Sequence, residues 1–122
     1  MPKRELRPRP IIITRGRFDF PVKPNPLRVS RRFGEAPHIV FDNQTLLYAQ
    51  VNFFEDDLIL DAKGKPLKSV PAIAPGGKSD PLTVNTRLGE GTYSYQVKLY
   101  DEGRTVSIEA SGRSRPEVEI QR

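Results

Sequence analysis

The chain has 122 residues, with 20 Lys and Arg against 15 Asp and Glu, one His, one Met, no Cys and no Trp. This length fits one domain with a single modest core. The lack of Cys excludes disulfides, thiolate metal sites, iron–sulfur clusters and cysteine nucleophiles. A single His cannot build a multi-histidine metal centre, and no apolar run approaches the 18 residues typical of a membrane-spanning helix.

The basic charge is concentrated in the first quarter of the chain. Residues 1–33 carry ten Lys or Arg and two acidic residues, a net charge of +8, whereas residues 34–122 carry a net charge of −3. Such asymmetry is typical of an arm that meets nucleic acid, an anionic membrane or an acidic protein, and equally of a solvated tail. The basic start lacks the 7–15 apolar residues of a secretory signal, which leaves a cytoplasmic protein and a mature exported domain both open.

Short apolar alternations separated by turn residues run along the whole chain. Residues 1–10 are basic and Pro-rich and end in Arg7-Pro8-Arg9-Pro10, which predicts an extended arm followed by a single domain over residues 11–122. The β-branched run at residues 11–14 and the later alternations each predict a strand. The expected strands after it are residues 27–30, 38–41, 46–54, 58–60, 82–84, 92–100, 105–110 and 117–120.

Turn residues delimit these strands. Asp42, Asn43 and Gln44 predict one turn, and Gly with Pro or Lys predicts others at residues 63–66 and 75–77. With eight or nine short strands and no segment that predicts a helix of three turns, the fold class is all-β and the spacing is that of a β-sandwich. Within residues 92–100, Tyr93 and Tyr95 share the apolar face, where packing and one hydroxyl bonded to nearby backbone are expected.

Two stretches resemble the cupredoxins, the Greek-key sandwiches of plastocyanin and its relatives. The first runs from LRVS at residue 27, through Gly34-Glu35, to HIVFDNQTLLYAQVNF ending at residue 53. The second, GTYSYQV from Gly91, is similar to the family's G-x-Y-x-F-x-C-x-x-H strand and ligand loop, with Tyr100 at its end. The resemblance implies a Greek-key, cupredoxin-like sandwich. An immunoglobulin-like sandwich is the alternative, because G-x-Y-x-Y-x-V occurs there as well.

The resemblance also implies where copper ligands would stand. The first His position falls on Ala49, the Cys on Val97, the second His on Tyr100 and the axial Met near Thr105. A blue-copper site needs two imidazoles and a thiolate. The resemblance therefore implies a copper-free sandwich without electron transfer, and we expect no cofactor and no metal.

Other polar motifs predict no catalytic residue. His38 begins a strand, and without a G-x-S-x-G motif it has no serine to activate. The acidic residues 55–57 indicate a solvated turn rather than a Ca²⁺ site, because neighbouring strand side chains point to opposite faces. Residues 75–79 end in Gly-Lys-Ser, but they lack the first Gly of a phosphate loop and a following helix, so a connecting turn is expected.

We therefore expect a non-enzymatic binding or structural module whose partner is another protein or a second copy. Contact is expected through the N-terminal arm or a sheet edge, with Ile11, Ile12 and Ile13 pairing either within their own domain or across a dimer. The alternative is a module that binds nucleic acid or another anionic surface through Arg4, Arg7, Arg9, Arg15, Arg17, Arg28, Arg31 and Arg32.

Overall fold

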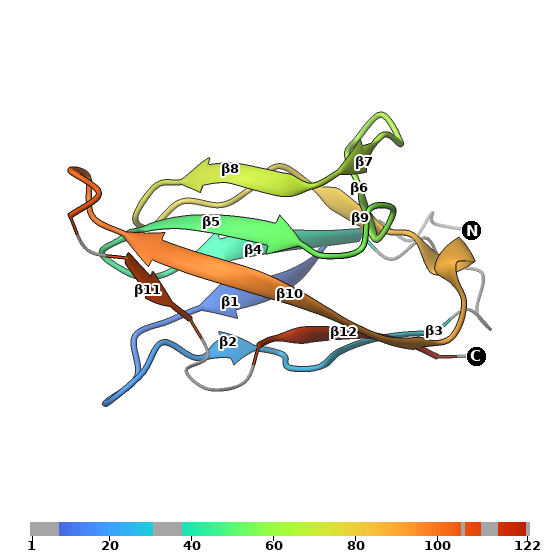
Figure 1. Ribbon diagram of the computed structural model, residues 1–122, viewed down its shortest axis with the longest axis horizontal. Coiled ribbons are helices and arrows are strands. Elements are labelled where there is room, and N and C mark those ends of the chain that lie inside the picture. The colour runs from blue at the N-terminus through green and yellow to red at the C-terminus, as the bar shows by residue number, and fades with distance from the viewer. Residues whose placement is uncertain (1–7, 31–37, 106, 111–114, 122) are drawn as a thin grey trace, which may run out of the picture.

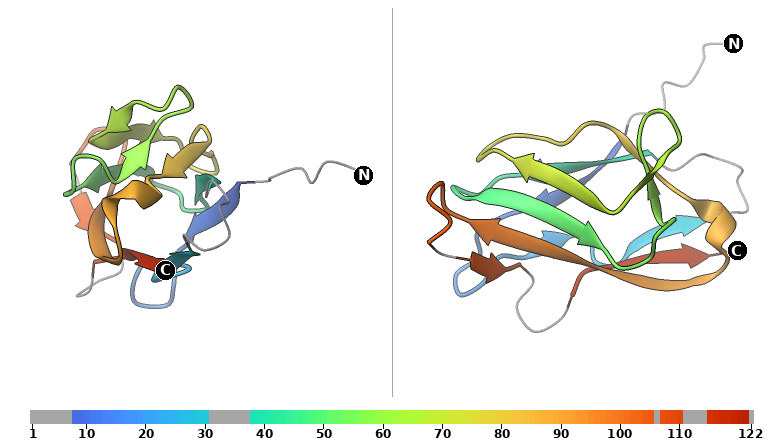
Figure 2. Two further views of the ribbon diagram at one scale, coloured as in Figure 1. Left: turned by 90° about the vertical axis from the view of Figure 1, so that its right-hand side faces the viewer. Right: turned by 45° about the horizontal axis from the view of Figure 1, so that its top comes forward.

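The computed structural model of the chain describes residues 8–30, 38–105, 107–110 and 115–121. Within these residues the fold is all-β, as predicted, and two curved sheets pack face to face (Figures 1 and 2). The first sheet orders β2 (Val22–Lys23), β1 (Arg9–Ile13), β4 (His38–Asn43), β9 (Leu82–Val84), β6 (Ile59–Leu60) and β7 (Pro66–Leu67). The second orders β3 (Leu27–Ser30), β12 (Glu117–Gln121), β10 (Gly91–Tyr100), β5 (Tyr48–Phe53) and β8 (Ser69–Ile73), with β11 (Ser107–Glu109) beside β10.

Each sheet contains one parallel pair of strands. In the first sheet β1 runs parallel to β4, with Ile13 opposite Asn43. In the second sheet β12 runs parallel to β3, with Ile120 opposite Val29. Parallel neighbours need a crossover, and here the chain leaves the first sheet to form β3 before it returns to form β4. Both sheets are therefore mixed.

Period-two patterning explains which side chains of β10 reach the core. Tyr95, Val97 and Leu99 are fully buried, as their shared face predicts, whereas Lys98 on the other face is exposed. Tyr100 departs from the pattern, since it lies on the outward face but is only 9 % exposed. The ring of Tyr48 stacks on it with centroids 5.8 Å apart, and the Arg104 guanidinium lies 4.8 Å from its centroid.

Strand β8 is an element that the sequence patterning did not predict, because Pro71 interrupts it. The strand lies at the edge of the second sheet, where a missing backbone N–H can be tolerated. Its pairing with β5 shifts register between Ala49 and Val51, so a β-bulge accommodates the proline. Val70 and Ile73 still point into the core.

Three aromatic rings meet between the sheets. Phe41 of the first sheet packs edge-on against Tyr95 of the second, with ring centroids 5.8 Å apart at 70°. Phe53 lies 6.2 Å from both rings. The hydroxyl of Tyr95 is buried among the described residues without a hydrogen-bond partner. Burial raises the pKa of Tyr95 well above its ordinary value of about 10.

The buried side chain of Asn43 connects the two sheets. It ends β4, and its Nδ2 donates to Leu47 O at 2.8 Å, Ile73 O at 3.0 Å and Ala74 O at 3.2 Å. Its Oδ1 accepts from the backbone N and the hydroxyl of Thr45, at 3.1 and 2.7 Å. Asn43 therefore closes the β4–β5 turn and also holds the end of β8 in the opposite sheet. The expected turn at residues 42–44 consequently lies later in the chain, at residues 44–47.

We expect Asn43→Asp to lower the free energy of unfolding at pH 7 by roughly 3 kcal/mol, because it removes the donors and places a carboxylate against carbonyl oxygens. Burial will raise the pKa of this new carboxyl above its unfolded value of about 3.9. The loss in the free energy of unfolding should therefore be smallest below pH 4, where the new carboxyl is protonated, and grow as the pH rises. Urea unfolding between pH 4 and 8 measures it. The exposed neighbour supplies a matched control, Gln44→Glu, with an expected change under about 1 kcal/mol.

We expect Tyr95→Phe to raise the free energy of unfolding by about 1 kcal/mol, because it removes a buried hydroxyl that forms no hydrogen bond. The neutral phenol contributes stability that is complete below pH 10 and is lost as the pH rises above it, since only the unfolded chain ionises readily there. The advantage of Tyr95→Phe should thus widen above pH 10 in thermal or urea unfolding. Equal or lower stability of the variant would show that the hydroxyl has a partner.

Candidate interaction surface

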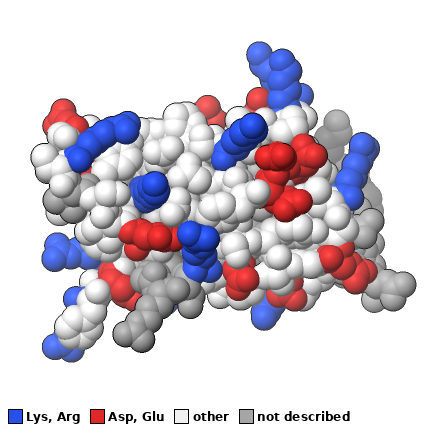
Figure 3. All heavy atoms as spheres, in the orientation of Figure 1, with Lys and Arg blue, Asp and Glu red and all other residues white. Residues whose placement is uncertain are grey.

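The described arginines of the predicted anion-binding set lie in two separate places. Arg9 opens β1 and Arg28 lies in β3, whereas Arg15 and Arg17 follow the other end of β1. Arg4, Arg7, Arg31 and Arg32 lie outside the described residues. On the face shown in Figure 3, Lys and Arg alternate with Asp and Glu. The described arginines of this set therefore do not form one continuous patch.

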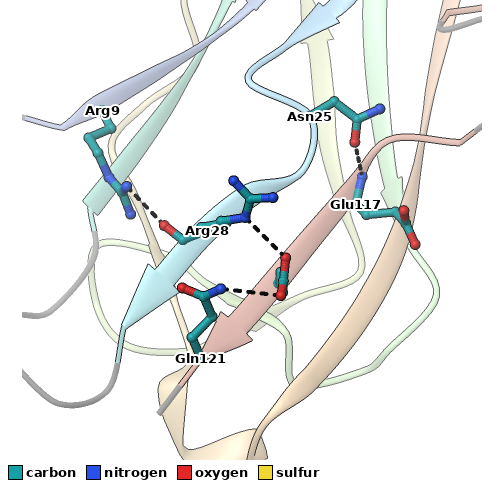
Figure 4. A network of polar contacts seen from close by, with 6 residues as sticks. Arg9, Asn25, Arg28, Glu117 and Gln121 are labelled. Carbon is teal, nitrogen blue, oxygen red and sulfur yellow. Dashed lines mark hydrogen bonds and ion pairs between the residues drawn. The ribbon is translucent and has the colours of Figure 1, made fainter.

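Arg9 and Arg28 take part in contacts within the protein (Figure 4). Arg9 Nη1 donates to the backbone carbonyl of Arg28 at 3.0 Å, which joins β1 of one sheet to the edge strand β3 of the other. The Arg28 guanidinium Nε lies 3.3 Å from Glu119 Oε2 on β12, and Gln121 Nε2 donates to Glu119 Oε1 at 3.2 Å. Arg28 remains 65 % exposed, so its ion pair adds little to stability.

The three isoleucines of the predicted pairing segment lie in β1, inside the first sheet. β1 has β4 on one side and β2 on the other. Ile11 and Ile13 are fully buried in the core, and Ile12 is partly exposed on the outer face. Of the two arrangements expected for this segment, the structure shows pairing within its own domain. β1 also begins at Arg9, so the last two residues of the expected arm belong to the strand.

The outer edges of both sheets carry features that hinder the addition of another strand. β2 and β7 contain two residues each. The edge strand β8 contains Pro71 and a β-bulge, and the Arg28 carbonyl on β3 is capped by Arg9. Short edges, bulges and proline are common means of blocking intermolecular pairing. Binding through a sheet edge is thus disfavoured, and another surface is the better candidate.

Two turns at one end of the sandwich expose large apolar side chains. We call this the loop end and define it as residues 14–21, 44–47 and 101–105, which gather at the left of Figure 1. Phe18 is 91 % exposed and Leu46 is 86 % exposed. Gln44 N donates to Ile13 O at 2.8 Å, which places the two turns beside each other. Side chains this exposed hold apolar surface in water, so burying them against a partner would be favourable.

A narrow hairpin presents Phe18. Thr14 N donates to Pro21 O at 3.1 Å and Gly16 N to Asp19 O at 2.7 Å, which leaves Arg17 and Phe18 at the tip. The Arg17 guanidinium lies 5.5 Å from the centroid of the Phe18 ring. A Cβ at Gly16 would lie 2.5 Å from the movable Asp19 Oδ1 and 3.2 Å from Asp19 O, so the turn has little room for a side chain there. Phe20, at the base of the hairpin, packs against the core instead.

The positions at which the resemblance places copper ligands hold no suitable donors. Ala49 and Val97 are fully buried core residues, Tyr100 is stacked on Tyr48, and Thr105 is exposed. His38 lies elsewhere, with Nδ1 3.1 Å from Thr83 Oγ1 on the neighbouring strand β9. Among the described residues no group of three or more His, Cys, Asp or Glu could hold a metal ion. These residues do not fit copper.

The remaining motifs serve as turns. Asp61 Oδ1 accepts the backbone N–H of Lys65 at 2.9 Å and of Lys63 at 2.8 Å, and these bonds lower the pKa of Asp61. Residues 75–79 connect β8 to β9, as predicted, and Gly77 O accepts from Asn43 N at 2.9 Å. Tyr93 donates its hydroxyl to Gly89 O at 3.1 Å, which is the backbone contact expected for one of the two tyrosines.

A groove of about 840 Å³ lies on the open side of the sandwich, between β8 and the segment that leads into β9. Its apolar floor includes Leu67, Val70 and Leu82. Lys63, Lys65 and Lys78 and two aspartates surround it. With an edge strand blocked by Pro71 on one wall, the groove is a less favourable binding surface than the loop end.

Comparison with protein-family models, curated proteins and solved structures found no match to this chain. Within the part of the chain that the structure describes, no helix has the length and apolar character needed to cross a membrane.

Proposed function

We propose that the protein is a non-catalytic, copper-free, cupredoxin-like module that binds another protein. The parallel pairs β1–β4 and β3–β12 support this fold over an immunoglobulin-like one, whose two sheets are antiparallel. The segments that resemble cupredoxins also supply matching elements, since residues 27–53 form β3, β4 and β5 and residues 91–100 form β10.

The exposure of Phe18 and Leu46 on adjacent turns carries the proposal. Each would contribute about 2 kcal/mol if a partner buried it fully, because the gain follows the apolar area removed from water. Aromatic side chains and arginine are also common among the residues that dominate binding energies, and the hairpin tip presents both as Arg17 and Phe18. Because both side chains are almost wholly exposed, they add little to packing within the chain.

We expect the double substitution Phe18→Ala and Leu46→Ala to abolish recovery of a protein partner while leaving the fold intact. Quantitative crosslinking in an extract of the source cells, with wild type and variant compared by mass spectrometry, measures the loss. Phe54→Ala is the matched control, because Phe54 is 52 % exposed beyond the other end of β5, where Arg115 covers its ring at 4.5 Å. If a recovered partner binds the wild type, the double variant and Phe54→Ala equally, the loop end is not its binding surface.

Binding to nucleic acid or another anionic surface is the second candidate function. The net charge of +8 over residues 1–33 favours it. Against it, Arg28 is paired with Glu119 and Arg9 donates to a carbonyl, while Arg15 and Arg17 lie at the far end of β1. The protein-binding function is therefore the stronger candidate.

If the anion-binding function holds, the protein should bind mixed-sequence DNA with an affinity that falls at least tenfold between 50 and 200 mM salt, since phosphate contacts release counterions. Fluorescence anisotropy measures this. A truncation that begins at residue 8 leaves β1 intact and tests the arm, and Arg15→Gln with Arg17→Gln tests the hairpin. Because we favour the protein-binding function, we expect that neither the truncation nor the Arg15→Gln and Arg17→Gln variant changes the affinity for DNA. A steep salt dependence that both variants reduce would reverse the ranking.

A further inference from the structure

The segment from β1 to β3 carries a protruding side chain and a depression close together. Phe18 extends from the tip of the hairpin and is 91 % exposed, so it does not pack into any hollow of its own chain. At the base of the same hairpin, the outer face of β1 and β2 forms a shallow depression of about 660 Å³. Its apolar lining includes Pro10, Ile12, Pro21 and Pro24.

We infer that the partner of this hairpin is a second copy of the chain, which packs about a two-fold axis so that Phe18 of each copy lies in the proline-lined depression of the other. This inference rests on the proposed function and names the partner for one part of the loop end. In a two-fold interface the same patch meets itself, so every contact occurs twice. Each copy presents both Phe18 and the depression, so one two-fold arrangement would use both features of each copy.

Charge complementarity supports the same arrangement. Arg17 lies beside Phe18 at the tip, and Asp19 lines the depression. Among the interactions between described residues, none pairs Asp19 with a cation. Insertion of Phe18 would bring Arg17 of each copy to the depression that holds Asp19 of the other, and thus form two ion pairs. Lys23 also lines the depression, so charge reversal distinguishes which of the two residues Arg17 meets.

Sedimentation velocity over a concentration series from 1 μM to 1 mM tests the inference. We expect a reversible monomer–dimer equilibrium in the wild type, and a dissociation constant at least tenfold higher in Phe18→Asp. Ile12→Glu, which alters the depression rather than the tip, should have the same effect. Phe54→Asp is the matched control, because Phe54 is 52 % exposed but lies beyond the other end of β5, and it should leave the equilibrium unchanged.

Charge reversal gives a test that does not depend on apolar contacts. Arg17→Asp and Asp19→Arg should each weaken the dimer at least fivefold, and the double variant should recover most of the loss because the pairs are restored with opposite sign. Circular dichroism and thermal unfolding check that each variant folds. Stronger association of Arg17→Asp would show that Arg17 meets Lys23 and would overturn this geometry.

The proposed function and this inference fail differently. A wild type that stays monomeric up to 1 mM, or a dimer that Phe18→Asp and Ile12→Glu leave intact, overturns the inference. If Phe18→Ala and Leu46→Ala still abolish recovery of a different protein, the proposed function stands without the dimer. If they leave that recovery unchanged and Phe18→Asp weakens the dimer, the second copy is the partner; if neither result changes, both proposals fall.

Discussion

The side chain of Asn43 forms the contact on which the rest of the structure most depends. It donates to carbonyls of the β4–β5 turn and of β8, and so ties the first sheet to the second at the loop end. The adjacent Gln44 N–H bonds to Ile13 O, where β1 passes into the hairpin. The Asn43 amide therefore holds the turn that carries Leu46, and the neighbouring Gln44 N–H joins that turn to the strand that leads to Phe18. A buried amide whose donors and acceptor are all used is rigid, because every alternative leaves a polar group unsatisfied.

The opposite side of the sandwich is closed by weaker contacts. Arg9 reaches from β1 to the Arg28 carbonyl at the edge of β3, and the pair of Arg28 with Glu119 is solvent-exposed. The side chains of Arg9 and Arg28 thus have partners within the chain, but these exposed contacts add little to stability. With Pro71 and a bulge on the edge strand β8, the described edges offer few free backbone groups in a regular row. The surface that is left available for a partner is thus the apolar one at the loop end, formed by Phe18 and Leu46.

The sequence patterns predicted the fold class because alternation records burial directly. Residues 27–30 form the expected strand, and β10 buries Tyr95, Val97 and Leu99 as its period requires. They failed where a neighbour distant in the sequence decides the outcome. Tyr100 is covered by Tyr48 although it points outward, and β8 forms despite Pro71 because a bulge and an edge position allow it. Local periodicity reveals neither the contact between Tyr48 and Tyr100 nor the place of β8 at the edge of the sheet.

The candidate surface shows the same limit. Phe18 and Phe20 have equal standing in the sequence, yet one is at the tip of a hairpin and the other packs on the core. The turn that separates them depends on Gly16 lying close to Asp19, a contact set by the fold of the loop. At the positions where the resemblance implies copper ligands, Ala49 and Val97 continue the apolar core. Apolar packing organises the sandwich there, and the turns of the loop end present Phe18 and Leu46 outward.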